Sequence, residues 1–316
     1  MSMTSFSVFR QLAAGIVVSL ALGTSAPEAA AQGTRDILLP PGTDTAWHGV
    51  WLPIKRTISA SQITTFEAQA GKKVGAEIYY VGWYANAWAD LQRQINVWEP
   101  LGIKTMVVWE PALKNHGDPL AAILSGSQDA IINDFAMQAQ TYGRPFFLRF
   151  AHEMNGNWYP WSGALSGSNP QKYIDAWRYV WTKFQSAGAT NAVWVWAPNW
   201  NSVPDESWNA LQNYYPGDAY VDVVANDLYD QGFKAAWDAN EALYAAHRKK
   251  PYAIAEWGLW GIDDPAFVER MAAFAETHRR LEFLAYFNSK PGSIWDLASK
   301  PKSRAAYRRV IAPLGR

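Results

Sequence analysis

Residues 146–161 of the chain read FFLRFAHEMNGNWYPW. The first part, Phe146–His152, is an apolar and aromatic run with the length of a β-strand, and a polar and aromatic segment follows it without a break. Helical periodicity begins at residue 170, where Asn169 precedes Pro170 as a capping residue precedes a first-turn proline. The stretch therefore predicts a strand, a loop that carries polar and aromatic side chains, and a helix over Pro170–Ala187.

The same alternation of short apolar runs and longer helical stretches extends over most of the chain. The other strand-like runs are His48–Leu52, Ala76–Val81, Thr105–Trp109, Ala192–Ala197, Val221–Ala225, Tyr252–Glu256 and Phe283–Phe287. The other helical stretches are Ser61–Lys72, Asn86–Glu99, Leu120–Tyr142, Asp205–Tyr214, Phe233–Lys249, Asp264–Arg280 and Lys302–Ile311. Eight strands that are each followed by a helix predict an α/β fold, a single (β/α)8 TIM barrel. No Gly-x-Gly-x-x-Gly motif follows any of these runs, which argues against a doubly wound nucleotide-binding sheet.

The amino-terminal residues are typical of an export signal. Leu12–Leu22 (LAAGIVVSLAL) is an apolar run too short to span a bilayer comfortably, and Ala29-Ala30-Ala31 offers a small-residue cleavage site. We predict a signal peptide over residues 1–31, a leader segment rich in Gly, Pro and polar residues over 32–46, and one barrel domain over 47–316. An uncleaved amino-terminal anchor is the alternative. The mature protein is then expected to be secreted or periplasmic, with no membrane attachment after cleavage.

The composition excludes several classes of function. Lys and Arg number 28 and so do Asp and Glu, and a chain without net charge has no basic field for binding nucleic acid. The absence of cysteine excludes disulfides, thiolate metal sites and cysteine nucleophiles, and no two of the five histidines have the i, i+4 spacing of a helical zinc site. We therefore expect no metal and no cofactor. The 18 tryptophans fit either aromatic core packing or platforms on which flat sugar faces stack.

Polar side chains collect where the predicted strands end, and a (β/α)8 barrel carries its active site at the carboxyl ends of its strands. Glu153 follows the fourth strand, Glu256 ends the seventh and Glu110 follows the third. Glycoside hydrolysis needs two carboxyl groups, one to protonate the leaving oxygen and one to attack the anomeric carbon or activate water. The ends of strands four and seven face each other across the barrel mouth, so Glu153 and Glu256 could approach the retaining distance of about 5–5.5 Å.

Residues 149–161 (RFAHEMNGNWYPW) closely resemble the signature of family 26 glycoside hydrolases. The similarity covers roughly residues 47–290 and includes these segments: Trp177-Arg178, Asn191–Pro198, Pro216-Gly217-Asp218, Asp222–Tyr229 and Glu256-Trp257-Gly258. The family contains many bacterial endo-β-mannanases, and also enzymes that cut mixed-linkage β-glucan or β-1,3-xylan. The resemblance implies a barrel in which Glu153 is the general acid/base and Glu256 is the nucleophile.

Four further residues are predicted to support this pair. Arg149 lies four positions before the acid/base, so on a continuous strand both side chains would face the barrel interior. There the arginine would hold the nucleophile charged, or form a barrel-core ion pair. The resemblance implies that His152 contacts the acid/base or the sugar, that Tyr229 hydrogen-bonds the nucleophile, and that Asp227 is a polar partner nearby. For His152 the alternative is core packing, and for Asp227 it is capping of the turn after the strand.

Several side chains are predicted to bind substrate, with core packing as the alternative for the tryptophans: Trp158, Trp161, Glu110, Trp83, Trp200, Phe287 and Trp295. The end of strand eight departs from what the resemblance leads us to expect. A mannanase would have a tryptophan there beneath the sugar, whereas this chain has Ala285-Tyr286-Phe287-Asn288, with Trp295 further on. Either Phe287 or Trp295 takes the stacking role, or the pocket accepts another sugar.

These observations predict a retaining endo-β-glycanase that acts by double displacement, with β-1,4-mannan as the leading substrate. Mixed-linkage β-1,3-1,4-glucan and a bacterial exopolysaccharide are the alternatives. Two other classes of protein stay open: a non-catalytic carbohydrate-binding barrel, and a metal-dependent barrel hydrolase with His and Asp ligands at its strand ends. We expect a monomer whose partner is a β-linked polysaccharide or oligosaccharide.

Overall fold

The computed structural model describes residues 46–53, 59–113, 117–167, 169–232 and 234–315. The predicted signal peptide and all of the leader segment except Ala46 lie outside the described residues. Within the described ranges, no helix combines the length and the apolar character needed to cross a membrane.

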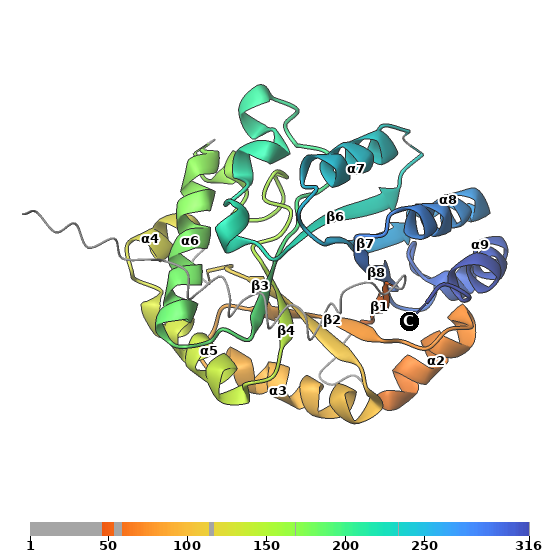
Figure 1. The fold of residues 1–316 in the computed structure, drawn as a ribbon, viewed down its shortest axis with the longest axis horizontal. Coiled ribbons are helices and arrows are strands. Elements are labelled where there is room, and N and C mark those ends of the chain that lie inside the picture. The colour runs from red at the N-terminus through yellow and green to blue at the C-terminus, as the bar shows by residue number, and fades with distance from the viewer. Residues whose placement is uncertain (1–45, 54–58, 114–116, 168, 233, 316) are drawn as a thin grey trace, which may run out of the picture.

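Eight parallel strands form a closed barrel in the order of the chain, and β8 pairs with β1 (Figure 1). Their bounds are β1 Trp47–Trp51, β2 Ala76–Gly82, β3 Lys104–Glu110, β4 Phe146–Phe150, β5 Ala192–Trp196, β6 Val223–Asp230, β7 Tyr252–Leu259 and β8 Leu281–Phe287. The predicted (β/α)8 fold is confirmed. The sixth and seventh strands run several residues further than the sequence predicts, and both extensions reach the carboxyl end of the barrel.

Helices cover the outside of the barrel. The α-helices are α2 Ala60–Ala70, α3 Ala87–Trp98, α4 Pro119–Leu124, α5 Asp129–Tyr142, α6 Pro170–Ser186, α7 Lys234–Ala246, α8 Pro265–Thr277 and α9 Pro301–Ala306. Short 3₁₀ turns are η1 Glu99–Leu101, η2 Gly163–Leu165, η3 Ser207–Asn209, η4 Leu211–Tyr214, η5 Asp218–Tyr220 and η6 Leu297–Ser299, and Tyr307–Ile311 (η7) is π-helical.

Two helix predictions are wrong. The stretch Leu120–Tyr142 is two helices, because Gly126 adopts a left-handed conformation with φ 76° and ends the first of them. The stretch Asp205–Tyr214 is not an α-helix. Ala210 is extended, with φ −56° and ψ 133°, and the side chain of Asn209 is tied to two backbone carbonyls outside the turn at 2.9 Å each.

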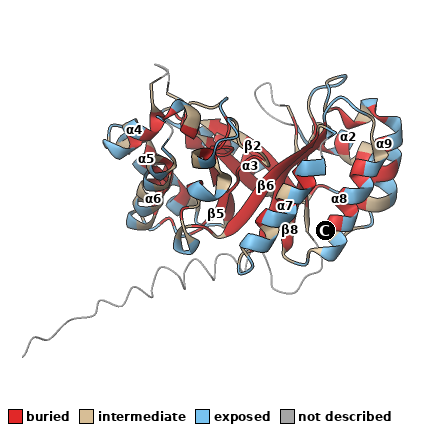
Figure 2. Cartoon of the chain, turned by 90° about the horizontal axis from the view of Figure 1, so that it is seen from above, coloured by how far each residue is buried: buried red, intermediate tan, exposed pale blue. Residues whose placement is uncertain are grey.

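The strands are buried, whereas the helices around them carry exposed faces (Figure 2). Alternation along the strands divides the core into two layers. Inside the barrel lie mostly small and β-branched side chains: Ala76, Ile78, Met106, Val108, Phe147, Val193, Val195, Ala197, Val223, Ala225, Ala253, Ala255, Phe283 and Ala285. The opposite strand faces pack against the helices with larger aliphatic and aromatic groups. Small interior residues leave a narrow barrel, so a side chain on the inward face near a strand end reaches the same mouth as its neighbours.

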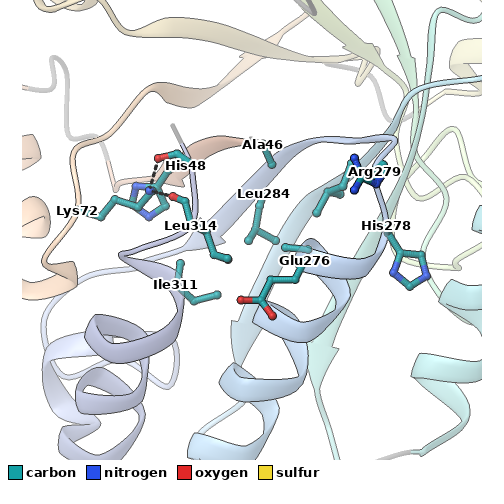
Figure 3. Close-up of a pocket in the computed structure, with 12 residues that line it drawn as sticks. Ala46, His48, Lys72, Glu276, His278, Arg279, Leu284, Ile311 and Leu314 are labelled. Carbon is teal, nitrogen blue, oxygen red and sulfur yellow. Dashed lines mark hydrogen bonds between the residues drawn. The ribbon is translucent and has the colours of Figure 1, made fainter. Parts of the chain in front are cut away.

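The amino-terminal end of the barrel carries a cavity of about 290 Å³ beside β1 and β8 (Figure 3). Nζ of Lys72 donates to the carbonyl oxygens of Leu314 and Gly315 and ties the carboxyl-terminal segment to this end. Because Leu281 and His48 line this cavity at the starts of their strands, it lies at the opposite end from Glu153 and Glu256.

Candidate active site

A cavity of about 520 Å³ opens at the carboxyl ends of the strands. Its lining contains both predicted catalytic glutamates together with a majority of aromatic and amide side chains: Trp51, Tyr80, Glu153, Trp158, Tyr159, Asn199, Asn201, Val203, Tyr229, Gln231, Glu256, Trp260, Phe287 and Trp295. Pockets that bind sugars and other small ligands have this mixture of apolar walls and a few convergent polar groups.

Glu256 reaches the cavity because of a β-bulge. Along β7, Ala253 and Ala255 face the barrel interior, so strict alternation would turn Glu256 outward. The pairing of β6 with β7 shifts at this point: Asn226 lies opposite Ile254, but Asp227 lies opposite Glu256. One extra residue in β7 therefore turns Glu256 back toward the mouth of the barrel.

Three donors converge on the Glu256 carboxylate. Nη1 of Arg149 donates to Oε1 at 2.5 Å, and the hydroxyl of Tyr229 donates to Oε2 at 2.6 Å. The hydroxyl of Tyr80 also donates to Oε1. Both predicted contacts of Glu256, those with Arg149 and Tyr229, are present. A carboxylate that accepts from an arginine and two phenols in a site shielded from water suits the role of an oriented anion.

Glu153 occupies the mouth for a different reason from the one that its spacing suggests. β4 ends at Phe150, and Ala151 and Glu153 have φ values of 46° and 51°, in the left-handed region that non-glycine residues rarely adopt. Two backbone bonds hold this turn: the Ala151 amide donates to the carbonyl of Trp109 at 3.1 Å, and the Glu153 amide donates to the carbonyl of Ala197 at 2.8 Å. The expectation that Arg149 and Glu153 share one face of a continuous strand is therefore wrong, although both side chains reach the site.

The pKa of the Glu153 carboxyl lies near neutral pH. Burial, and secondly the negative charge of Glu256, raise its pKa to about 7. Arg149 and the hydrogen bond of 2.8 Å from Nε1 of Trp158 oppose this rise. A carboxyl with this pKa keeps much of its proton at neutral pH and can give it to a leaving group.

Asp227 completes the charged centre. Nη2 of Arg149 donates to its Oδ2, and both side chains are fully buried. Burial raises the pKa of Asp227 well above its usual range, an effect that the positive charge of Arg149 opposes. One guanidinium thus bridges Asp227 and Glu256, so the predicted barrel-core ion pair and the predicted support of the nucleophile are the same interaction.

Two of the predicted contact residues build the loop beneath the cavity and are not part of its lining. His152 is fully buried, and its Nε2 lies 3.0 Å from the hydroxyl of Tyr159. Trp161 is 1% exposed, donates to the carbonyl of His152 at 2.7 Å and stacks on Tyr159. By contrast, Trp158 is 44% exposed and lines the cavity beside Glu153.

The other predicted substrate contacts divide in the same way. Phe287 and Trp295 line the cavity, with their ring centroids 5.4 Å apart. Trp83 does not: it is 4% exposed and packs on Trp109, so its prediction as a sugar platform is corrected to a core role. Trp200 is half-buried and also packs against the core outside the cavity lining.

Glu110 is the last residue of β3 and lies on the inward face, in register with Met106 and Val108. It is half-buried and outside the cavity lining. Burial, and secondly the charge of Glu256, raise its pKa to about 7. A second carboxyl therefore titrates in the same range as Glu153, close to the same anion.

Several lining residues are absent from the sequence-based prediction, notably Trp51, Tyr80 and Trp260. Two of them carry a usable signal. Tyr80 shares the inward face of β2 with Ala76 and Ile78, and Trp51 ends β1, where it stacks on Phe287 with centroids 4.1 Å apart. Trp260 follows β7 and is 43% exposed at the rim, where only the tertiary fold decides its place.

Across the described ranges, no group of three His, Cys, Asp or Glu side chains is arranged to hold a metal ion. The chemistry that the cavity offers comes from its carboxyl groups and their hydrogen-bond donors.

A closed eight-stranded barrel with two carboxyl groups in an aromatic cavity at its carboxyl end has the architecture of the barrel glycoside hydrolases. The profile of glycosyl hydrolase family 26 matches residues 111–290, more than half of the chain. The chain belongs to this family, as the signature at Arg149–Trp161 predicts.

The chain is similar to Endoglucanase H of Acetivibrio thermocellus, with 28% identity over 279 residues; the similarity covers 83% of this chain and 30% of that protein. It is also similar to Mannan endo-1,4-beta-mannosidase A and B of Caldalkalibacillus mannanilyticus, with 29% identity over 191 residues, 53% of this chain and 36% of that protein. The chain thus spans about a third of the length of these relatives.

Solved structures share the fold. A β-mannanase of this family from Bacteroides ovatus superposes with a TM-score of 0.67 and 19% identity, covering 90% of this chain and 92% of that one. The catalytic domain of an endo-β-1,4-mannanase from a Bacillus species gives a TM-score of 0.67 and 16% identity over 89% of each chain. At this level of identity the likeness describes the barrel and does not extend to the substrate.

Proposed function

We propose that this chain is a retaining endo-β-glycanase that hydrolyses internal β-1,4 bonds of mannan. The observation that carries the proposal is the contrast between two carboxyl groups in one cavity. Glu256 accepts hydrogen bonds from Arg149, Tyr80 and Tyr229, whereas the Glu153 pKa is raised to about 7. Acid-assisted attack on a glycosidic bond requires one carboxyl group that can donate a proton to the leaving oxygen and a second that is held in position to attack the anomeric carbon.

In this proposal Glu256 attacks the anomeric carbon while Glu153 protonates the leaving oxygen, so that the glycosidic C–O bond breaks as an ester bond to Glu256 forms. Glu153 then removes a proton from water, and the resulting hydroxide attacks the anomeric carbon and releases Glu256. Two inversions restore the β configuration. Family membership and the partial mannanase relatives support the substrate class.

Mixed-linkage β-1,3-1,4-glucan is the second candidate substrate. The relative that matches the largest share of this chain among those described above is named as an endoglucanase. In addition, β8 ends in Phe287 beside Trp295, where the predicted mannanase tryptophan is missing. A bacterial exopolysaccharide is the third candidate substrate.

Digestion of glucomannan, barley β-glucan, β-1,3-xylan and bacterial exopolysaccharide, followed by product masses, tests the substrate. Release of manno-oligosaccharides is expected, whereas release of gluco-oligosaccharides alone would favour mixed-linkage glucan as the substrate.

A second experiment tests the catalytic pair. Glu153→Ala and Glu256→Ala should each lose nearly all activity. Azide should restore turnover of Glu256→Ala and give a glycosyl azide of inverted configuration. A Glu256→Ala variant with full activity would contradict the proposal. A non-catalytic sugar-binding barrel would bind oligosaccharides in calorimetry but release no product from any polysaccharide.

We also propose that the protein is exported and acts as a monomer outside the cytoplasm. The apolar run Leu12–Leu22 and the small residues at 29–31 support export. Expression of the full chain with its native amino terminus, followed by amino-terminal sequencing of the extracellular fraction, should find a start near residue 32. Light scattering on the same fraction reports the oligomeric state.

A further inference from the structure

A second cavity adjoins the catalytic one. It has a volume of about 300 Å³ and lies between the end of β6 and the amino-terminal halves of α7 and α8, two helices that stand next to each other in Figure 1. Tyr229 and Gln231 line both cavities. Tyr229 also hydrogen-bonds Glu256. Its side chain therefore separates a sugar bound at the catalytic centre from the second cavity.

The charged groups of the second cavity balance. Its lining includes two cationic side chains, Lys234 and Arg270, and two carboxyl groups, Asp230 and Asp264. Two of these four have structural partners: Lys234 pairs with Asp238 at 2.7 Å, and Asp264 caps α8 by accepting from the amide of Ala266 at 2.9 Å. A balanced lining gives no net attraction to an anionic or cationic ligand.

The other two charged groups are Asp230, which can accept hydrogen bonds, and Arg270, which can donate them. Asp230 is 4% exposed, and its Oδ1 accepts from the amide of Gly232 at 3.2 Å. Its Oδ2 accepts no hydrogen bond from the residues that the structure describes. Arg270 is exposed, and the central carbon of its guanidinium lies over the ring of Trp237, 4.6 Å from the ring centroid.

From these contacts we infer that the cavity between the starts of α7 and α8 is an accessory subsite for a neutral sugar branch of the polysaccharide, held by Asp230 and Arg270. A sugar hydroxyl both donates and accepts, so one sugar ring can give a hydrogen bond to the carboxylate and accept one from the guanidinium. The balanced charges of the lining offer an anionic substituent no net attraction. This inference rests on the proposed endo-glycanase function, because it places the branch on a chain bound beside Glu256.

The burial of Asp230 is consistent with this role. Desolvation raises the pKa of its carboxyl, and the nearby charge of Asp264 raises it further, while the bond from Gly232 opposes the rise. A buried carboxyl oxygen without a partner, as Oδ2 of Asp230 is among the described residues, is costly for the protein until a donor reaches it. A hydroxyl of the ligand is such a donor.

The test compares a branched polysaccharide with the same preparation after enzymatic removal of its branches. These substrates are galactomannan and galactomannan treated with α-galactosidase, which share the β-1,4-mannan backbone of the proposed substrate. Hydrolysis of unbranched β-glucan alone, with neither galactomannan cut, would overturn the subsite. Asp230→Asn keeps Oδ1 for the bond to Gly232 and changes only Oδ2 and the charge. Arg270→Met keeps an unbranched side chain and removes the guanidinium with its N–H groups. Glu276→Gln, in the cavity at the opposite end of the barrel, is the matched control.

The measured quantity is the ratio of kcat/KM on the branched substrate to kcat/KM on the debranched one. Asp230→Asn and Arg270→Met should each lower this ratio about tenfold, the effect of losing one hydrogen bond to a charged group, and Glu276→Gln should leave it unchanged. Arg270→Lys, which keeps a cationic donor, should retain part of the ratio. An unchanged ratio in both variants overturns the subsite while leaving the proposed function intact. Absence of hydrolysis of every backbone by the unaltered protein would remove the proposed function itself.

Discussion

The guanidinium of Arg149 donates a hydrogen bond of 2.5 Å to Oε1 of Glu256, and neither side chain has more than 6% of its surface open to solvent. The same guanidinium binds Asp227, so the arginine fixes the position of Glu256 against the wall of β6. Replacement by Lys keeps the charge but offers no planar fork with two parallel donors. The geometry of Glu256 should therefore depend on arginine specifically.

Arg149→Lys should lower kcat by about a hundredfold, comparable with the loss of one preorganised donor in other active sites, and should change KM little. Arg149→Met should in addition destabilise the fold, because it leaves Asp227 and Glu256 buried without their cation. Steady-state kinetics and urea unfolding of both variants separate the two effects. Wild-type kcat in Arg149→Lys would show that charge alone is sufficient.

The pH dependence of kcat/KM should follow the protonation of Glu153. An acid must carry its proton, so activity should fall as the pH rises through about 7, the pKa that burial and the charge of Glu256 give to this carboxyl. Because Glu110 titrates in the same range, Glu110→Gln is the control: the alkaline limb should persist in it. Loss of the limb in Glu110→Gln would transfer the assignment to that residue.

A direct measurement complements the rate profile. Glu256→Gln removes the negative charge that contributes to the raised pKa of Glu153, so the Glu153 pKa should fall below 7 but stay above its ordinary value of 4.5, because burial persists. Carboxyl-selective ¹³C NMR of Glu153 in this variant reports the change. A pKa that stays at 7 would mean that burial alone sets it.

Gly156 allows Trp158 to reach Glu153. A Cβ atom at position 156 would lie 2.5 Å from the indole of Trp158, too close for any side chain. Gly156→Ala should therefore displace the indole and break the bond of 2.8 Å to Oε2 of Glu153. Since that bond lowers the Glu153 pKa, the alkaline limb should move to higher pH, with a loss of kcat of about tenfold. Trp158→Phe, which keeps a ring but has no N–H, should reproduce the shift if the hydrogen bond is the cause.

How far the sequence predicts this site depends on what places each residue. Tyr80 is predictable in principle, because it shares the inward face of its strand with Ala76 and Ile78. Glu256 is predicted by position in the chain, but its inward orientation comes from a bulge that no alternation pattern indicates. Glu153 likewise depends on a left-handed turn fixed by hydrogen bonds to Trp109 on β3 and to Ala197, which directly follows β5.

The tryptophans show the same limit. Trp83 and Trp158 both follow strands and both could stack on a sugar. The first is enclosed by Trp109 and Phe150, whereas the second lies over a glycine at the cavity mouth. The residue type is the same for the two, and each follows a strand; the contacts between distant segments separate core from lining.

Glu77 provides a test of stability that is independent of the active site. It lies on the outward face of β2, fully buried beside Trp98, and burial raises its pKa well above 4.5. Between 4.5 and the raised pKa, the unfolded chain loses the Glu77 proton while the folded chain keeps it. This contribution to the free energy of unfolding is therefore fully present below pH 4.5 and decreases as the pH rises, by about 1.4 kcal/mol per pH unit, until the raised pKa is passed.

Glu77→Gln keeps the shape and cannot ionise, so it should remove this slope. Its free energy of unfolding, relative to that of the wild type, should increase from pH 5 to pH 8 when both are measured by urea denaturation. Glu276→Gln, whose side chain is exposed, should follow the wild type at both pH values. Parallel pH profiles of wild type and Glu77→Gln would contradict this prediction. They would mean that a partner in the folded chain stabilises the Glu77 anion, so that the carboxyl releases its proton at the same pH in the folded and the unfolded chain.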